Sequence, residues 1–80
     1  MTTLEWQNNF GNRLRTLMKE QGVTQNRLAR DSGLSTSRIN DYVKGRSVPT
    51  VYALIKIAYA LDTTPGKLAD FNERIRKTKG

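Results

Sequence analysis

The stretch VTQNRLARDSGLSTSRINDYVK, residues 23–44, decides the fold of this chain. Thr24 and Ser35 are suitable helix N-caps, because a threonine or serine hydroxyl accepts a hydrogen bond from the first turn of a helix. Gly33 stands between them, where the chain must turn sharply and needs a positive φ angle. Ala29 is placed where the two helices would cross, and a bulky side chain there would push them apart. The stretch therefore predicts two short helices joined by a tight turn.

The second of these helices has a clear inward side. Ile39, Tyr42 and Val43 lie on one side of it, and Gly45 is placed to end it. Leu34 and Ile39 are expected to fill the wedge between the two helices. A short helix, a turn that carries glycine and a second helix form the helix-turn-helix arrangement. Each feature is common in helical hairpins, and it is their combination that carries the prediction.

The segment before this stretch predicts an amphipathic helix. Thr2 and Glu5 suit a capping box at its start, with Asn8 or Asn9 as the alternative, later start. Gly22 is placed to end the helix in the left-handed conformation. The apolar residues that recur at spacings of three and four are Trp6, Phe10, Leu14, Leu17 and Met18.

The segment after it predicts two more helices. Thr50 is the expected N-cap of the fourth helix, and Thr64 followed by Pro65 predicts a fifth, because proline is favoured at the first helical position. The residues expected to face inward from the fourth helix are Val51, Leu54, Ile55, Ala58 and Leu61. The apolar side of the fifth helix consists of Leu68, Phe71 and Ile75. No strand pattern is present, so the predicted fold class is all-α, a compact five-helix bundle.

The composition excludes many kinds of active site. A chain of 80 residues is expected to form a single domain, and it contains neither cysteine nor histidine. This removes disulfides, Cys- or His-based metal sites and Ser-His-Asp catalysis. Phosphodiester hydrolysis needs clustered carboxylates or a histidine base, whereas the 7 acidic residues are scattered along the chain. We therefore expect no enzyme, no metal and no other cofactor.

The charge points to a polyanionic partner. The 14 lysines and arginines against 7 acidic residues give a net charge of +7. Such a domain is expected to meet nucleic acid or an anionic membrane surface, with a merely soluble basic protein as the alternative. The longest nearly apolar run, residues 51–61, is interrupted by Lys56 and is too short to span a membrane. The N-terminus lacks the pattern of a secretory signal. We expect a cytoplasmic, nucleoid-associated protein.

Three segments carry a resemblance to a known family: RLRTLMKEQGVTQNRLA, SGLSTSRINDYVKGR and PTVYALIKIAYALDTTPGKL. They resemble the phage-repressor (Cro/cI-type, or XRE) helix-turn-helix family over about residues 10–70. The resemblance implies a lambda-repressor-like bundle whose third helix enters the DNA major groove. It also implies a homodimer on a pseudo-palindromic operator, with double-stranded DNA as the partner. No small-molecule ligand is evident from the sequence. The chain would be a single DNA-binding domain, residues 1–80, with a basic C-terminal extension at 71–80.

The sequence departs from the family's pattern at two places. Many relatives carry an arginine where this chain has Met18 and a glutamate where it has Val43, and those two side chains form a buried ion pair. Because packed apolar residues often replace such a pair without loss, we interpret Met18 and Val43 as a substituted core contact. Asp62 stands at a helix end where relatives often have glycine, and aspartate tolerates the left-handed conformation better than most residues.

The predicted base contacts lie on the outward side of the third helix. If Ile39 and Val43 point into the core, the opposite side shows Thr36, Ser37, Asn40, Asp41 and Lys44. Asn40 suits adenine, Thr36 offers a methyl group to thymine, and Ser37 can donate or accept. Solvated helix residues without a DNA role are the alternative. Asp41 either accepts from a cytosine amino group, holds Arg38 or Lys44 in place, or lies on the helix shoulder and deters wrong sites.

The predicted phosphate contacts surround this helix. Gln25 opens the preceding helix, where free N–H groups and the positive end of the dipole suit a phosphate. The resemblance implies that Gln25 also braces the third helix. The full predicted set is Thr24, Gln25, Arg38, Lys44, Arg46 and Ser47. Arg27 and Arg30 belong either to this set or to the exposed side of their helix.

The core of so small a bundle does not cover every apolar residue. We expect the apolar residues that stay exposed to form a surface for self-association. The candidate dimer contacts are Tyr59, Leu68, Phe71 and Ile75. Tyr52 and Tyr59 are interpreted as half-exposed packing residues, with a dimer contact as the alternative. Trp6 and Phe10 are interpreted as core residues, with a partner surface as the alternative. The basic residues of the tail either graze the DNA backbone or keep the protein soluble.

Two functional hypotheses follow. The first is a sequence-specific DNA-binding transcriptional regulator, a repressor of phage or bacterial type that acts as a homodimer. The second is an antitoxin or another protein-interaction module built on the same fold. Such a module would need a long extension to wrap its partner, and residues 71–80 are too short and too polar for that role. The sequence therefore favours the regulator.

Overall fold

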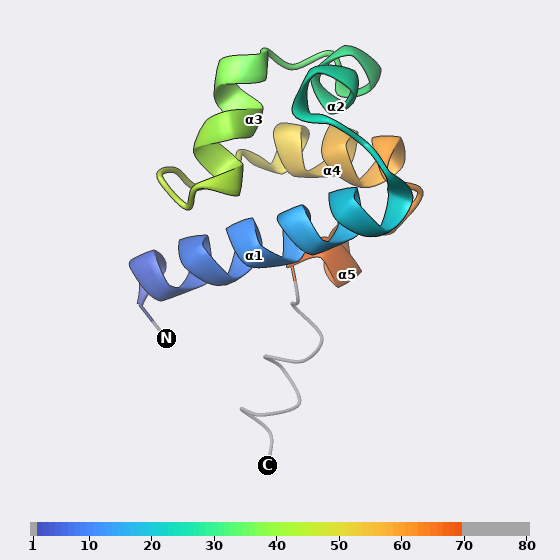
Figure 1. Ribbon diagram of the computed structural model, residues 1–80. Coiled ribbons are helices and arrows are strands. Elements are labelled where there is room, and N and C mark those ends of the chain that lie inside the picture. Colours follow the sequence, from blue (N-terminus) through green and yellow to red (C-terminus); the bar gives the residue numbers. More distant parts are fainter. Residues whose placement is uncertain (1, 70–80) are drawn as a thin grey trace.

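The computed structural model describes residues 2–69, and this part of the chain is helical, without strands. Its helices are α1 (Thr3–Gln21), α2 (Gln25–Ser32), α3 (Thr36–Val43), α4 (Val51–Ala60) and α5 (Pro65–Ala69). Contacts join α1 to α3, α3 to α2, α2 to α4, α4 to α5 and α5 back to α1, so the helices close into a bundle (Figure 1). The all-α prediction is confirmed.

The predicted helix starts are confirmed by the hydroxyl groups that cap them. Each capping oxygen accepts a hydrogen bond from the backbone N–H three residues later, at 3.0–3.2 Å. The capping residues are Thr2, Thr24, Ser35, Thr50 and Thr64. At the first of them, Glu5 also returns a bond to the Thr2 backbone N–H, which completes the predicted capping box. The later starts at Asn8 and Asn9 are therefore wrong.

The turn between α2 and α3 has the geometry that its glycine predicts. Gly33 has φ +75°, and its N–H donates to the Ala29 carbonyl at 2.9 Å. The next N–H, of Leu34, donates to the same carbonyl at 3.1 Å. Asp62 takes the left-handed conformation at the end of α4 with φ 55°, also as predicted. Local residue preferences thus set both the start and the end of these helices.

The inward side of α4 differs from the prediction. Val51 is 74% exposed and Ile55 is only partly buried, whereas Ala53 and Ile57 are fully buried. Almost every residue of α4 is apolar, so periodicity alone allowed more than one inward side. The contacts of α4 with α2 and α5 decide which side is covered. The residues of α4 and its C-cap that form the core are Ala53, Leu54, Ile57, Ala58 and Leu61.

Other core assignments are confirmed, with one correction. Met18 and Val43 are both buried, so these apolar replacements lie in the core. Phe10 is buried and stacks on the partly buried Trp6, with ring centroids 5.1 Å apart. Leu68, expected at a dimer surface, is 0% exposed and instead closes the core between α5 and its neighbours. Within residues 2–69, no helix combines the length and apolar character needed to cross a membrane.

Candidate nucleic-acid interface

The outward side of α3 is polar, as the sequence predicts. Ile39, Tyr42 and Val43 are buried, so the remaining residues of the helix turn away from the bundle. Thr36, Ser37 and Arg38 are exposed, and Asn40 and Asp41 are partly exposed. The structure therefore brings the predicted base-contacting residues Thr36, Ser37, Asn40 and Asp41 together on one helix side. Thr36 and Ser37 stand in its first turn, next to the cap at Ser35.

A hydrogen bond joins this side of α3 to the start of α2. The Asn40 Nδ2 donates to Oε1 of Gln25 at 3.1 Å, in a partly buried position. An amide side chain has two N–H donors and one carbonyl acceptor, so the bond uses only part of the capacity of Asn40. Gln25 thus contacts α3 directly, which agrees with the bracing role that the resemblance implies. The bond fixes the orientation of both amides.

Asp41 has a partner that the sequence did not indicate. Its Oδ1 lies 3.9 Å from Nη1 of Arg46, and its backbone carbonyl accepts from the Arg46 N–H at 2.8 Å. The sequence suggests Arg38 and Lys44 as cations that Asp41 could hold, whereas in the structure the carboxylate of Asp41 pairs with Arg46. The two side chains are 61% and 43% exposed, so the ion pair adds little stability in water. Its effect is to hold Arg46 beside the C-terminal end of α3.

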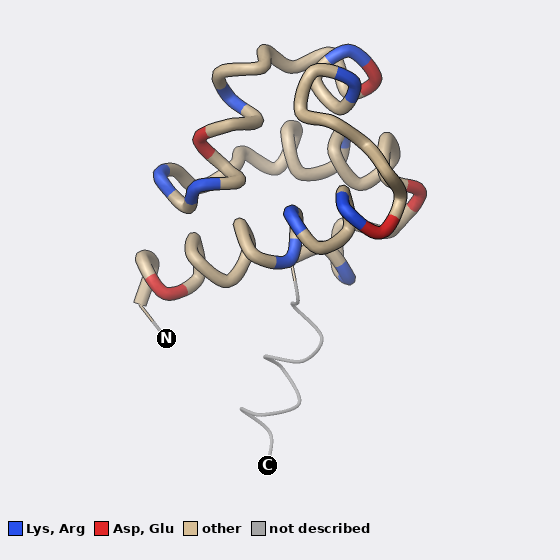
Figure 2. Tube along the Cα trace, viewed as in Figure 1, with Lys and Arg blue, Asp and Glu red and all other residues tan. Residues whose placement is uncertain are grey.

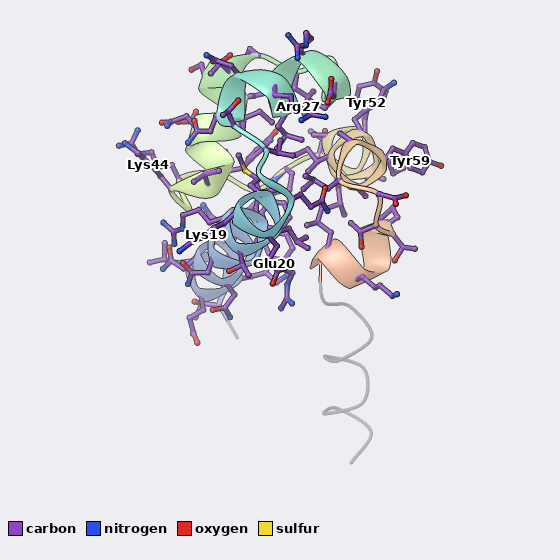
Figure 3. The ribbon with its side chains drawn as sticks, turned by 45° about the vertical axis from the view of Figure 1, so that its right-hand side comes forward. Lys19, Glu20, Arg27, Lys44, Tyr52 and Tyr59 are labelled. Carbon is purple, nitrogen blue, oxygen red and sulfur yellow. The ribbon has the colours of Figure 1, made fainter. Side chains whose placement is uncertain are left out.

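Basic side chains follow α3 directly. Lys44 and Arg46 are exposed on either side of Gly45, and Ser47 is partly exposed. Figure 2 shows basic residues along the turn that follows α3, beside the acidic position near the end of that helix. In Figure 3, Lys44 projects away from the bundle, on the opposite side of the view from Tyr52 and Tyr59. This turn places positive charge next to the polar side of α3.

The start of α2 supplies the remaining predicted phosphate contacts. Thr24 is exposed and caps the helix through its hydroxyl oxygen, so its own O–H remains able to donate. Gln25 follows it as the first helical residue. Arg38 lies on α3, at the residue whose N–H bonds the Ser35 cap. All six predicted phosphate-contacting residues therefore border the polar side of α3 or the turn after it.

The arginines of α2 have an acidic neighbour. Asp31 Oδ2 lies 3.5 Å from Nε of Arg27, and its Oδ1 lies 3.9 Å from Nε of Arg30. The three side chains are between 41% and 77% exposed. One carboxylate thus offsets part of the positive charge on α2. This favours the interpretation of Arg27 and Arg30 as the exposed side of their helix.

Sequence reasoning missed the contribution of α1 to this region. Gln7 donates from Nε2 to the Gly45 carbonyl at 3.2 Å, so α1 touches the turn that carries Lys44 and Arg46. Gly11 is buried where α1 meets the end of α3. A glycine inside an otherwise amphipathic helix indicates a close approach of two backbones. That signal was present in the sequence, whereas nothing local indicated a role for Gln7.

The tyrosines of α4 lie on an exposed side of the bundle. Tyr52 is 64% and Tyr59 is 74% exposed, so the interpretation of half-exposed packing is wrong for both. The Lys56 ammonium lies 5.4 Å from the centre of the Tyr52 ring, a cation–π contact. Tyr59 is thus available for self-association. Phe71 and Ile75, the other predicted dimer contacts, lie outside the described residues, as does the basic extension 71–80.

These elements define the class of the protein. A short helix capped by Thr24, a left-handed turn at Gly33 and a second helix with a polar outward side form a helix-turn-helix, the motif that presents a helix to the DNA major groove. A helix-turn-helix family model, HTH_3, matches residues 14–68. The chain belongs to this XRE-type family of DNA-binding regulators.

Solved structures of other regulators have the same fold. The restriction-modification controller protein C.AhdI from Aeromonas hydrophila is 35% identical, with a TM-score of 0.75 over 78% of this chain and 94% of that one. An HTH_3 family transcriptional regulator from Vibrio cholerae has a TM-score of 0.82 at 24% identity, over 92% of this chain and 42% of its own. The clp gene regulator ClgR from Corynebacterium glutamicum has a TM-score of 0.75 at 21% identity, over 92% of this chain and 82% of its own. A search of curated proteins found no match.

Proposed function

We propose that this protein is a sequence-specific transcriptional regulator, a repressor that binds a pseudo-palindromic DNA operator as a homodimer. The observation that carries the proposal is the polar outward side of α3, bordered by Lys44 and Arg46 on the turn that follows it. The similarity to C.AhdI, a controller protein, supports a regulatory role. Because its proposed partner is operator DNA, the protein would act in the cytoplasm, at the nucleoid.

Base recognition is assigned to the first two turns of α3. Ser37 can donate to or accept from a base edge, and the Thr36 methyl group can contact a thymine. Asn40 keeps one N–H and its carbonyl after bonding Gln25, which is the pair of groups that adenine requires. Asp41 is turned toward Arg46, so its carboxylate offsets the charge of that arginine and discourages a badly placed phosphate. Specificity would then come from three short side chains.

Phosphate binding is assigned to the rim of α3. Thr24 and Gln25 stand at the N-terminus of α2, where free N–H groups and the helix dipole favour an anion. Lys44, Arg46 and Ser47 offer donors from the turn at the other end of α3, and Arg38 adds a cation near its start. Phosphate contacts at both ends of a helix fix its register in the groove.

Self-association is assigned to the exposed side of α4. Tyr59 is a large apolar residue with 74% of its surface exposed, and aromatic residues are enriched at protein interfaces. Two copies of α3 would need a separation of about 34 Å to enter successive major grooves. Operator half-sites would then be related by two-fold symmetry, like the protein. Phe71 and Ile75, which lie outside the described residues, remain part of this proposal.

The test is selection of bound duplexes from a random pool, repeated at low and moderate salt. A two-fold symmetric motif with half-sites about one helical turn apart is the expected result. Six to ten neutralised phosphates per dimer would give a slope of log K against log salt of about −5 to −9. Enrichment of no sequence, with binding that disappears as salt rises, would contradict the proposal. It would favour the protein-interaction module instead.

A further inference from the structure

The turn after α3 rests on the N-terminal half of α1. Gln7 donates from Nε2 to the carbonyl of Gly45 at 3.2 Å, a partly buried bond between residues 38 positions apart. In Figure 1 this turn lies next to the first turns of α1. The bond joins the middle residue of the segment Lys44-Gly45-Arg46 to a helix that carries none of the proposed DNA contacts. We call this segment the basic turn.

The backbone of the basic turn lies close to α1. Gly45 is buried and has φ +71°. A Cβ atom at this position would lie 2.5 Å from Oδ1 of Asn8 and 3.3 Å from the Asn8 Cα. The backbone conformation therefore favours glycine here, and any larger residue would also displace the Asn8 side chain. The turn therefore lies against α1, with Lys44 and Arg46 on either side of the point of contact.

The last turn of α3 approaches α1 equally closely. A Cβ atom at Gly11 would lie 2.7 Å from the Val43 carbonyl oxygen and 2.8 Å from that of Tyr42. The Phe10 and Tyr42 rings meet edge to face nearby, with centroids 6.3 Å apart. Gly11 and Phe10 thus set the distance between the two helices. The bond from Gln7 then ties the basic turn itself to α1.

The three backbone N–H groups of the basic turn donate to carbonyls of α3 at 2.8–3.1 Å, whereas its basic side chains have few contacts that hold them. Arg46 is held by the backbone carbonyl of Asp41 and by a solvent-exposed ion pair at 3.9 Å. Lys44 is exposed, and within residues 2–69 it forms no ion pair. Binding of a phosphate requires the turn to hold one geometry, and a turn already held in that geometry loses less conformational freedom on binding.

We propose that Gln7 is a positioning residue for DNA binding: its hydrogen bond to Gly45 holds the basic turn in the geometry that contacts phosphate. Gln7 itself touches no DNA in this arrangement and acts through Lys44 and Arg46. The inference rests on the proposed function. It adds to that function a residue outside the helix-turn-helix on which affinity depends.

The experiment compares Gln7→Ala and Gln7→Met in the full chain, with the selected operator duplex as the probe. The methionine variant keeps the length of the side chain and removes the amide, including the N–H donor. Gln21→Ala is the matched control, because Gln21 also donates from α1 to a backbone carbonyl, that of Leu61 at 2.7 Å, at the other end of the helix. We expect both Gln7 variants to bind about 3–10-fold more weakly, as for a lost hydrogen bond, and Gln21→Ala to bind like the parent.

A double-mutant cycle separates positioning from a general loss of structure. If Gln7 acts through the basic turn, its replacement in the Arg46→Ala background should cost much less than in the parent chain. The slope of log K against log salt should also become shallower in Gln7→Met, toward that of Arg46→Ala. Fully additive losses with an unchanged salt slope would overturn the proposal, even if affinity falls.

The two proposals fail in different ways. If the parent chain selects an operator and Gln7→Met binds it with parental affinity, the positioning role is wrong and the proposed function stands. If the parent chain selects no operator, the proposed function is wrong and the positioning role falls with it. Circular dichroism of each variant at the binding temperature identifies unfolding. Loss of helix in Gln7→Met, with Gln21→Ala folded, would assign Gln7 to the fold and overturn a role confined to DNA binding.

Discussion

Asn40 on α3 donates a hydrogen bond from Nδ2 to Oε1 of Gln25 at the N-terminus of α2, with 3.1 Å between the two atoms. The bond connects a residue proposed to contact a base with a residue proposed to contact a phosphate. Each side chain therefore restricts the orientation of the other. Base recognition and phosphate binding are coupled at this point of the interface, and substitution of either residue should affect both.

Replacement of Gln25 tests this coupling. In Gln25→Ala the Asn40 amide loses its protein partner and the start of α2 loses a proposed phosphate contact. We expect operator affinity to fall by about 1–3 kcal/mol, with part of the loss in base preference at the Asn40 position. Competition binding with operator variants measures both effects. A uniform loss at every base would mean that Gln25 contacts phosphate without orienting Asn40.

Substitutions on the outward side of α3 should relax specificity. Ser37→Ala and Asn40→Ala each remove a hydrogen-bonding group from a proposed base contact. We expect each to cost about 1–3 kcal/mol on the operator and much less on random DNA. Repeating the pool selection with each variant shows which base position loses its preference. Equal losses on operator and random DNA would reassign these residues to backbone contacts.

Arg46 should behave in the opposite way. Because Arg46 is proposed to contact phosphate, Arg46→Ala should weaken binding to all sequences about equally and make the salt slope of the dimer shallower by about 2, one unit for each copy. Titrations at several salt concentrations, on operator and random duplexes, provide the measurement. Arg30→Ala is a suitable control, since Arg30 is 77% exposed and neighbours Asp31 instead of the basic turn. A change in base preference in Arg46→Ala would contradict the assignment.

Gly11 should be needed for stability. In Gly11→Ala the new methyl group would lie 2.7 Å from the Val43 carbonyl oxygen, so α1 and α3 must separate. We expect the free energy of unfolding to fall by about 1–3 kcal/mol, as for other overpacked cores. Gly66→Ala is the matched control, because nothing lies within 4 Å of a Cβ atom at Gly66 in α5. It should instead stabilise the protein by about 0.4–1 kcal/mol. Urea unfolding measures the free energy of unfolding of both variants. An unchanged value for Gly11→Ala would mean that α1 and α3 separate without cost.

Tyr59 should contribute to self-association. Tyr59→Glu places a charge in the proposed dimer surface, and we expect the dimer dissociation constant to rise by about tenfold or more, which corresponds to about 1.4 kcal/mol. Tyr52→Glu is the control, because it makes the same chemical change at an exposed position of the same helix, and it should have little effect. Sedimentation equilibrium measures both. A larger effect of Tyr52→Glu would move the dimer surface toward the N-terminal end of α4.

The helix starts and turns could be predicted because the forces that set them act within a few residues. A hydroxyl at Thr24 or Ser35 accepts from an N–H three positions later, and Gly33 can adopt its left-handed angle without steric cost. The outward side of α3 could be predicted for a similar reason, since Ile39 and Val43 mark its inward side unambiguously. The family resemblance then extended this local pattern to the arrangement of the bundle.

The features that were missed depend on residues far apart in the chain. The apolar helix α4 could have buried more than one side, and its contacts with α2 and α5 selected Ala53 and Ile57 over Val51. Leu68 is likewise buried by residues that are distant from it in the sequence, so the local sequence could not predict its burial. A hydrophobic pattern indicates that a side chain favours burial. Whether the side chain is buried depends on how the helices pack.

The sequence by itself therefore determined the helices, their caps, the helix-turn-helix and the polar side of α3, because these follow from local hydrogen bonds and periodicity. The tertiary structure decided which partners those side chains have. It brought Gln25 to Asn40, Arg46 to Asp41 and Gln7 to Gly45. A polar side chain can bond any suitable group within its reach, and which group is within reach is set by how the helices pack.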